Sequence, residues 1–168
     1  MQRRIFLTLA AVLLPLTAVA QAPPVSAPPA AAPVAAETAS KTYIPGIEQF
    51  MNVIQSEHAK LWYAGQARNW ELAAYQLGEI KEIMSDVEDL YPKFKDLPLG
   101  KMLDDVITGP IVELEKALDA KDFGKFSAGY GKLTDACNAC HQATGMGFVV
   151  IQRPANAGFP NQDFRPRK

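Results

Sequence analysis

The sequence predicts an all-α protein, built as an antiparallel four-helix bundle with an irregular C-terminal extension. From Tyr43 onward, apolar residues recur with the 3.6-residue period of an α-helix. Short breaks that contain Pro, Gly or a good N-cap residue divide this region into four segments, and short connections favour antiparallel neighbours. No stretch before residues 148–151 shows a convincing strand alternation. A chain of 168 residues fits one such domain.

The first twenty residues have the three parts of a secretory signal peptide. Arg3 and Arg4 form a positive start, residues 5–16 are mostly apolar, and residues 18–20, Ala-Val-Ala, offer a small-residue cleavage site. An uncleaved membrane anchor is the alternative, but the apolar stretch is short for a bilayer span, which needs about 20 residues. We therefore expect cleavage after residue 20 and export to the periplasm.

Residues 21–42 are predicted to be a disordered linker. They are dominated by Ala and Pro, and they lack the large apolar side chains that would offset the entropy lost on ordering a chain. Proline also keeps such a tract extended. The four-helix domain is therefore expected over residues 43–146.

The first helix is predicted over about residues 45–66, and the second from Asn69 to about residue 91. Pro45 suits a first helical turn, where its missing N–H would have no partner. Asn69 is a good N-cap, and Pro92 stops the second helix. The buried stripe of the first helix comprises Ile47, Phe50, Met51, Ile54, His58, Leu61 and Trp62, and that of the second Leu72, Tyr75, Gln76, Ile80, Ile83, Val87 and Leu90.

The third helix is interrupted in its pattern, because Gly109-Pro110 falls inside its apolar series. We expect a kink there, or a short helix followed by a longer one that begins near Pro110. A fourth helix is predicted from Asp122 as N-cap to about residue 143, with Gly145 as its stop. Residues 147–168 are rich in Gly, Pro, Asn and Arg, and are expected to form an irregular tail.

Charge and cysteine content exclude two classes of function. The formal net charge is -1, and removal of the two arginines of the signal peptide leaves 15 basic against 18 acidic residues, or -3. A weakly acidic surface argues against nucleic acid as a partner, since phosphate binding relies on clustered Lys and Arg. The only two cysteines, Cys137 and Cys140, lie three residues apart, so disulfide bonds cannot join distant segments of this chain, which excludes a disulfide-stabilised fold.

The run Cys-Asn-Ala-Cys-His at residues 137–141 predicts covalent attachment of one haem c. Cys137 and Cys140 lie about one helical turn apart, so their thiols can reach two vinyl groups on one porphyrin edge, and His141 can direct its imidazole at the iron. A thioredoxin-like redox pair is one alternative, although such a pair opens a helix after a strand. A zinc site is another, but it needs further soft ligands, and His58 is the only other His or Cys.

The chain resembles the cytochrome c′ family and its low-spin relatives, which are four-helix bundles with Cys-x-x-Cys-His near the end of the last helix. Cys137, Cys140 and His141 match the motif, after three earlier helical segments and a signal peptide. The resemblance covers about residues 44–143 as architecture, and only the motif is specific. It implies gas binding (NO or CO) as one function and a homodimer as one assembly. Unlike the family, this chain continues for 27 residues beyond His141, with no basic residue directly after the motif.

The ligand opposite His141 decides the function that we expect. His58 is the first candidate for the distal iron ligand, Met51 is the alternative, and an open site is the third outcome. Two protein ligands favour a periplasmic mono-haem cytochrome that transfers electrons to and from redox partner proteins and is not an enzyme. An open or displaceable site favours gas binding or sensing. A peroxidase-like enzyme, with His58 as acid/base, is the remaining alternative.

Overall fold

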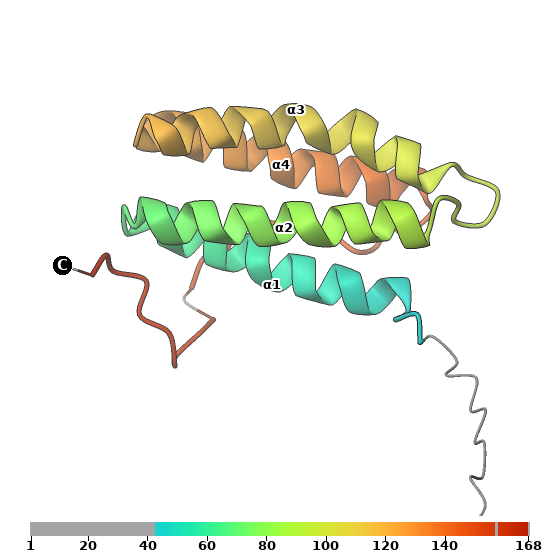
Figure 1. Cartoon of the computed structure of the whole chain (residues 1–168), viewed down its shortest axis with the longest axis horizontal. Coiled ribbons are helices and arrows are strands. Elements are labelled where there is room, and N and C mark those ends of the chain that lie inside the picture. Colours follow the sequence, from blue (N-terminus) through green and yellow to red (C-terminus); the bar gives the residue numbers. More distant parts are fainter. Residues whose placement is uncertain (1–42, 157, 168) are drawn as a thin grey trace, which may run out of the picture. The chain divides into compact units, whose positions relative to one another are not determined.

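The computed structural model describes residues 43–156 and 158–167, so the predicted signal peptide (1–20) and linker (21–42) lie outside the described residues. Four helices follow one another up and down and form a bundle (Figure 1). The all-α class and the antiparallel four-helix bundle are therefore confirmed. The helices are α1 (Ile47–Gln66), α2 (Trp70–Leu90), α3 (Leu99–Asp119) and α4 (Phe123–Ala143).

Short polar and glycine signals fix where the helices begin and end. The side chain of Asn69 accepts a hydrogen bond from the backbone N–H of Leu72 at 3.2 Å, which caps α2 as predicted. Asp122 caps α4 in the same way, accepting from the N–H of Lys125 at 3.1 Å. After α4, Gly145 adopts φ of 79°, the left-handed conformation in which glycine ends a helix at little cost.

The prediction of two separate helices around Gly109-Pro110 is wrong. α3 runs without interruption from Leu99 to Asp119, with Pro110 inside it. Proline removes one backbone donor from a helix interior, but Ile107 and Ile111, on either side of it, are both buried. Burial of this apolar stripe keeps α3 in one piece, because tertiary packing outweighs the local preference.

At one end of the interface between α1 and α4, aromatic side chains of the two helices pack against each other. Trp62 of α1 lies 6.1 Å from Phe126 and 5.1 Å from Tyr130 of α4, measured between ring centroids. Gly65 allows this approach, since a Cβ atom there would lie 2.1 Å from the Phe126 ring. Toward the other end, where α1 begins and α4 ends, the two helices diverge around a cavity.

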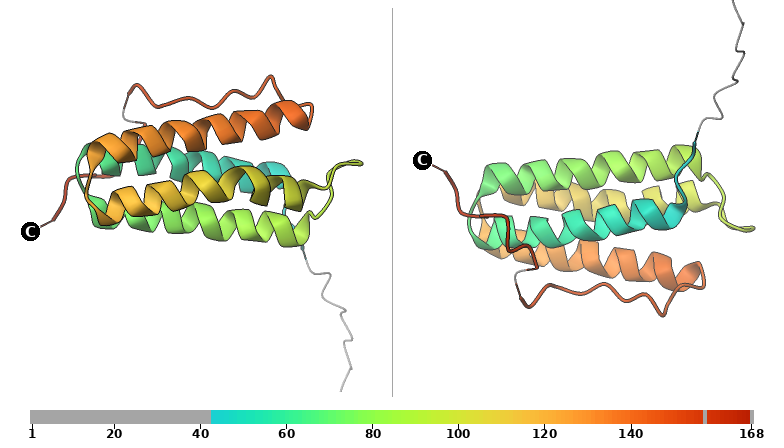
Figure 2. Two further views of the ribbon diagram at one scale, coloured as in Figure 1. Left: turned by 90° about the horizontal axis from the view of Figure 1, so that it is seen from above. Right: turned by 90° about the horizontal axis from the view of Figure 1, so that it is seen from below.

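The C-terminal tail is irregular, as predicted, and it packs along α4 and against α1 (Figure 2). The hydroxyl of Tyr63 donates to the backbone carbonyl of Asn156, and the rings of Phe159 and Phe164 contact Tyr63 with centroids 6.3 and 5.3 Å away. No strand occurs in residues 43–156 and 158–167, where a single bridge joins Phe94 and Leu97. The tail is thus a covering layer of the bundle without regular structure.

Candidate cofactor site

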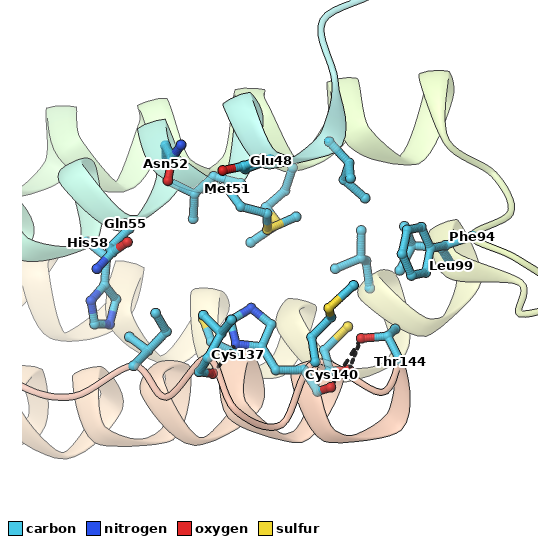
Figure 3. A pocket seen from close by; sticks show the side chains of 18 of the residues that line it. Glu48, Met51, Asn52, Gln55, His58, Phe94, Leu99, Cys137, Cys140 and Thr144 are labelled. Atoms are coloured by element: carbon cyan, nitrogen blue, oxygen red, sulfur yellow. Dashed lines mark hydrogen bonds between the residues drawn. The ribbon is translucent and has the colours of Figure 1, made fainter.

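A cavity of about 450 Å³ lies between the first half of α1 and the end of α4. Its size falls within the range of about 300–1,000 Å³ that is typical of cofactor sites. The walls are mainly apolar, whereas three exposed polar side chains of α1 stand at its edge (Figure 3). The lining residues are Ile47, Glu48, Met51, Asn52, Ile54, Gln55, His58, Met84, Phe94, Leu99, Leu103, Ile107, Cys137, Cys140, His141, Thr144, Met146, Phe148, Val149 and Ile151.

Both cysteines of the motif line this cavity from the last turns of α4 (Figure 3). Cys140 is buried and Cys137 is half-buried, and both are free thiols. Their spacing of three residues puts them about one turn apart along one face of the helix. The two sulfur atoms therefore serve one local site, as the sequence predicted from their spacing.

The imidazole of His141 is held by the tail. Its Nδ1 lies 2.8 Å from the backbone carbonyl oxygen of Val149. A carbonyl oxygen only accepts, so Nδ1 carries the proton and donates it. In the neutral imidazole the second ring nitrogen, Nε2, then has the lone pair, which is the tautomer required of a histidine that binds a metal through Nε2.

His58, the first candidate for the distal ligand, is buried in a hydrogen-bonded network with α4. Its Nε2 lies 3.0 Å from the Thr134 hydroxyl, and its Nδ1 lies 2.8 Å from the Tyr130 hydroxyl. The rings of His58 and Tyr130 also stack, with centroids 4.3 Å apart. Burial lowers the pKa of His58 to about 4, so the imidazole is neutral at pH 7. Both of its ring nitrogens are thus already bonded within the protein.

Met51, the alternative distal ligand, lies at the same level of the bundle as His141. The hydrogen bond between His58 of α1 and Thr134 of α4 shows that these two residues lie at the same level of the bundle. Because the two helices are antiparallel, a residue a given number of positions before His58 lies level with the residue the same number of positions after Thr134. Met51 lies seven residues before His58, and His141 lies seven residues after Thr134. Seven residues correspond to about two turns, or about 10 Å, along each helix. Figure 3 shows the Met51 side chain reaching into the cavity across from Cys137.

One functional element of the site was not predicted from the sequence. Asn138, inside the motif, donates through Nδ2 to the carbonyl of Ile151 and accepts through Oδ1 from its N–H, both at 2.8 Å. These bonds hold the tail over the end of α4. No sequence pattern predicts a hydrogen bond between an asparagine and a backbone group 13 residues away in an irregular segment. The contact between Asn138 and Ile151 is therefore visible only in the structure.

The thiols do not have the surroundings of a redox-active pair. Burial raises the pKa of Cys137 to about 11 and also raises the pKa of Cys140. A reactive Cys-x-x-Cys pair needs a lowered thiol pKa, commonly at a helix N-terminus, whereas this pair lies near the C-terminal end of α4. Within the described residues, no group of three or more His, Cys, Asp and Glu side chains gathers as a metal site of the kind that the zinc alternative requires.

The residues present fit a covalently attached haem. Two free thiols, the His141 imidazole and the thioether of Met51 belong to residues that line a cavity with mainly apolar walls, and Met84 and Met146 line it as well. At the exposed polar edge, the amides of Asn52 and Gln55 fit the amphipathic character of a porphyrin with two carboxylates, whereas the Glu48 carboxylate does not contribute a donor.

Comparisons with protein-family models, curated proteins and solved structures find no match for this chain. Among the helices of residues 43–156 and 158–167, none combines the length and the apolar character that a bilayer crossing requires. The functional interpretation therefore rests on the chemistry of the cavity.

Proposed function

We propose that this protein is an exported mono-haem c-type cytochrome, related to the cytochrome c′ group, that transfers electrons to and from redox partner proteins in the periplasm. The observation that carries the proposal is that Cys137, Cys140 and His141 line one cavity, with the Nδ1–H of His141 bonded so that Nε2 is free. The thiols of Cys137 and Cys140 would hold the haem, each by adding its S–H across one vinyl group to give a thioether.

A bound haem supplies an iron that cycles between Fe(II) and Fe(III), and the chain holds and shields it. Nε2 of His141 provides the proximal ligand. The apolar walls from α1, α3 and α4 keep water away from the macrocycle, which favours fast electron exchange with little rearrangement of solvent. The amides of Asn52 and Gln55 offer hydrogen-bond donors to the haem carboxylates at the exposed edge.

We assign the distal ligand to Met51 in preference to His58. Met51 lies level with His141, whereas His58 lies level with Thr134, which is about 10 Å before His141 along α4. Ligation by His58 would also break its buried bond to Thr134 or to Tyr130, a net loss of about 0.5–1.5 kcal/mol, because each hydroxyl keeps a second bond to a backbone carbonyl. A His/Met iron is six-coordinate and suits electron transfer.

Gas binding is the second candidate function. The observation that favours it is that Met51 lies level with His141, and thioether sulfur is a weak ligand that CO or NO could displace. A peroxidase-like role for His58 has less support. Both of its ring nitrogens are bonded, and its pKa of about 4 makes it a poor base near pH 7.

Visible spectroscopy of the protein, produced in a periplasm with the c-type haem attachment machinery, tests the proposal. We expect the mass of the chain to increase by one haem, and ferric and ferrous spectra of a low-spin, six-coordinate iron that CO leaves unchanged. A low-spin spectrum that CO alters would favour gas binding. The double variant Cys137→Ala/Cys140→Ala is the control and should carry no covalent haem. Wild-type protein that carries no haem would contradict the proposal.

A further inference from the structure

A second set of contacts joins the haem-attachment motif to the C-terminal tail. Asn138 presents one donor and one acceptor to the backbone of Ile151, and both bonds measure 2.8 Å. This pairing is the one that a neighbouring backbone strand would make, and it fixes Ile151 in position and in orientation. Asn138 lies three residues before His141 in α4, about one turn away.

The same segment of the tail supplies the acceptor for His141. Val149 lies two residues before Ile151, and its carbonyl oxygen is 2.8 Å from Nδ1 of His141. The near end of the segment is fixed by a turn, in which the N–H of Met146 donates to the His141 carbonyl at 2.7 Å. Asn138 thus fixes the far end of a short loop whose middle contacts the imidazole.

Apolar packing alone does not hold this loop. The side chains of Phe148 and Val150 are 80% and 70% exposed, so they add little burial to the segment. The position of the Val149 carbonyl therefore depends chiefly on hydrogen bonds: those at the two ends of the loop, and one inside it from the Val149 N–H to the Met146 carbonyl at 2.8 Å.

We propose that Asn138 is a positioning residue that tunes the haem iron through the tail. By clamping Ile151, it places the Val149 carbonyl on the Nδ1–H of His141 and so fixes the tautomer, the ring orientation and the electron donation of the proximal ligand. A carbonyl acceptor on Nδ1–H makes the imidazole a stronger donor, which stabilises Fe(III) and lowers the reduction potential. This inference rests on the proposed function, since it requires the haem.

The test compares wild-type holoprotein with Asn138→Ala, which removes both bonds to Ile151. Asn138→Asp is the second variant: it keeps an acceptor for the Ile151 N–H and loses the donor. Val150→Ala is the matched control, because it changes an exposed side chain in the same loop. The readouts are the midpoint potential and, by NMR in the ferrous low-spin state, the solvent exchange rate of the His141 Nδ1–H.

We expect Asn138→Ala to raise the midpoint potential and to speed exchange of the His141 ring proton about tenfold, the effect of weakening one hydrogen bond. Asn138→Asp should fall between Asn138→Ala and wild type, and Val150→Ala should match wild type. If Asn138→Ala leaves both values unchanged, or if Val150→Ala changes them equally, the inference is overturned while the haem assignment stands. Wild-type protein without haem would instead overturn the proposed function.

Discussion

At the scale of single residues, the choice between Met51 and His58 has a direct spectroscopic consequence. In Met51→Leu the thioether is replaced by a side chain of similar volume that cannot bind iron, so the ferric protein should become high-spin and the ferrous protein should bind CO. His58→Asn is the control, and it should keep the low-spin spectrum. A change in spin state in His58→Asn, with none in Met51→Leu, would reverse the assignment.

The same histidine makes the folded protein sensitive to acid. Burial lowers the pKa of His58 from 6.5 to about 4, so between these values the unfolded chain binds a proton that the folded protein does not. The stabilisation from the neutral imidazole is complete above about pH 6.5 and is lost as the pH falls toward 4, by up to about 3 kcal/mol.

Urea unfolding of wild type and His58→Asn between pH 7 and pH 4 measures this contribution. The variant should be less stable at pH 7, because it loses the contacts to Tyr130 and Thr134. Its stability should also fall less across the acid range. Parallel pH profiles for the two proteins would show that His58 does not titrate in this way.

At the scale of helices, the interface between α1 and α4 depends on the absence of a side chain at Gly65. A Cβ atom there would lie 2.1 Å from the ring of Phe126, which is fully buried and has little room to move. Gly65→Ala should therefore destabilise the protein by about 2–3 kcal/mol through overpacking. Gly78→Ala in α2 is the matched control, since a Cβ atom meets nothing within 4 Å there. It should be neutral or stabilising by up to about 1 kcal/mol.

Denaturant midpoints for the two variants test this difference. Equal effects of Gly65→Ala and Gly78→Ala would mean that α1 and α4 can separate slightly without cost. The comparison also separates helix propensity from packing, because alanine favours the helix at both positions, and less at Gly65 near the end of α1, whereas only Gly65→Ala creates a clash.

Helix positions were predictable because the signals that set them are local. Asn69 and Asp122 cap α2 and α4 through bonds to residues three positions away. The apolar period marks most of each buried stripe, but Tyr75 and Leu90, which the period places in the stripe of α2, are exposed. The two-helix alternative at Pro110 failed because the local effect of proline competes with burial of Ile107 and Ile111, which depends on neighbouring helices.

At the scale of the whole molecule, the site was predictable only in part. The spacing of Cys137, Cys140 and His141 follows from chain geometry, and the structure places all three around one cavity. The alignment of α1 with α4 along the bundle is set by side-chain packing, so the sequence alone could not show which residue of α1 lies level with His141. The bonds of Asn138 and Val149 to partners 13 and 8 residues away lie equally beyond local patterns.

If the cavity holds the proposed haem, its size predicts how the whole protein responds when the haem is lost. A dry cavity costs about 24 cal/mol per Å³, so 450 Å³ would cost on the order of 10 kcal/mol, which is comparable with the total stability of a domain. Water entering at the exposed edge of α1 reduces this cost, but the walls are mainly apolar and gain little from it.

The haem-free variant Cys137→Ala/Cys140→Ala should therefore keep helical far-UV circular dichroism while losing near-UV signal and binding a hydrophobic dye, as a molten globule does. Its unfolding in urea should be shallow, whereas the holoprotein should unfold in one cooperative step. The aromatic cluster around Trp62 and Phe126 lies away from the cavity, so residual protection from hydrogen exchange should be concentrated there. A haem-free variant with native near-UV signal and a cooperative transition would show that the bundle closes without the cofactor.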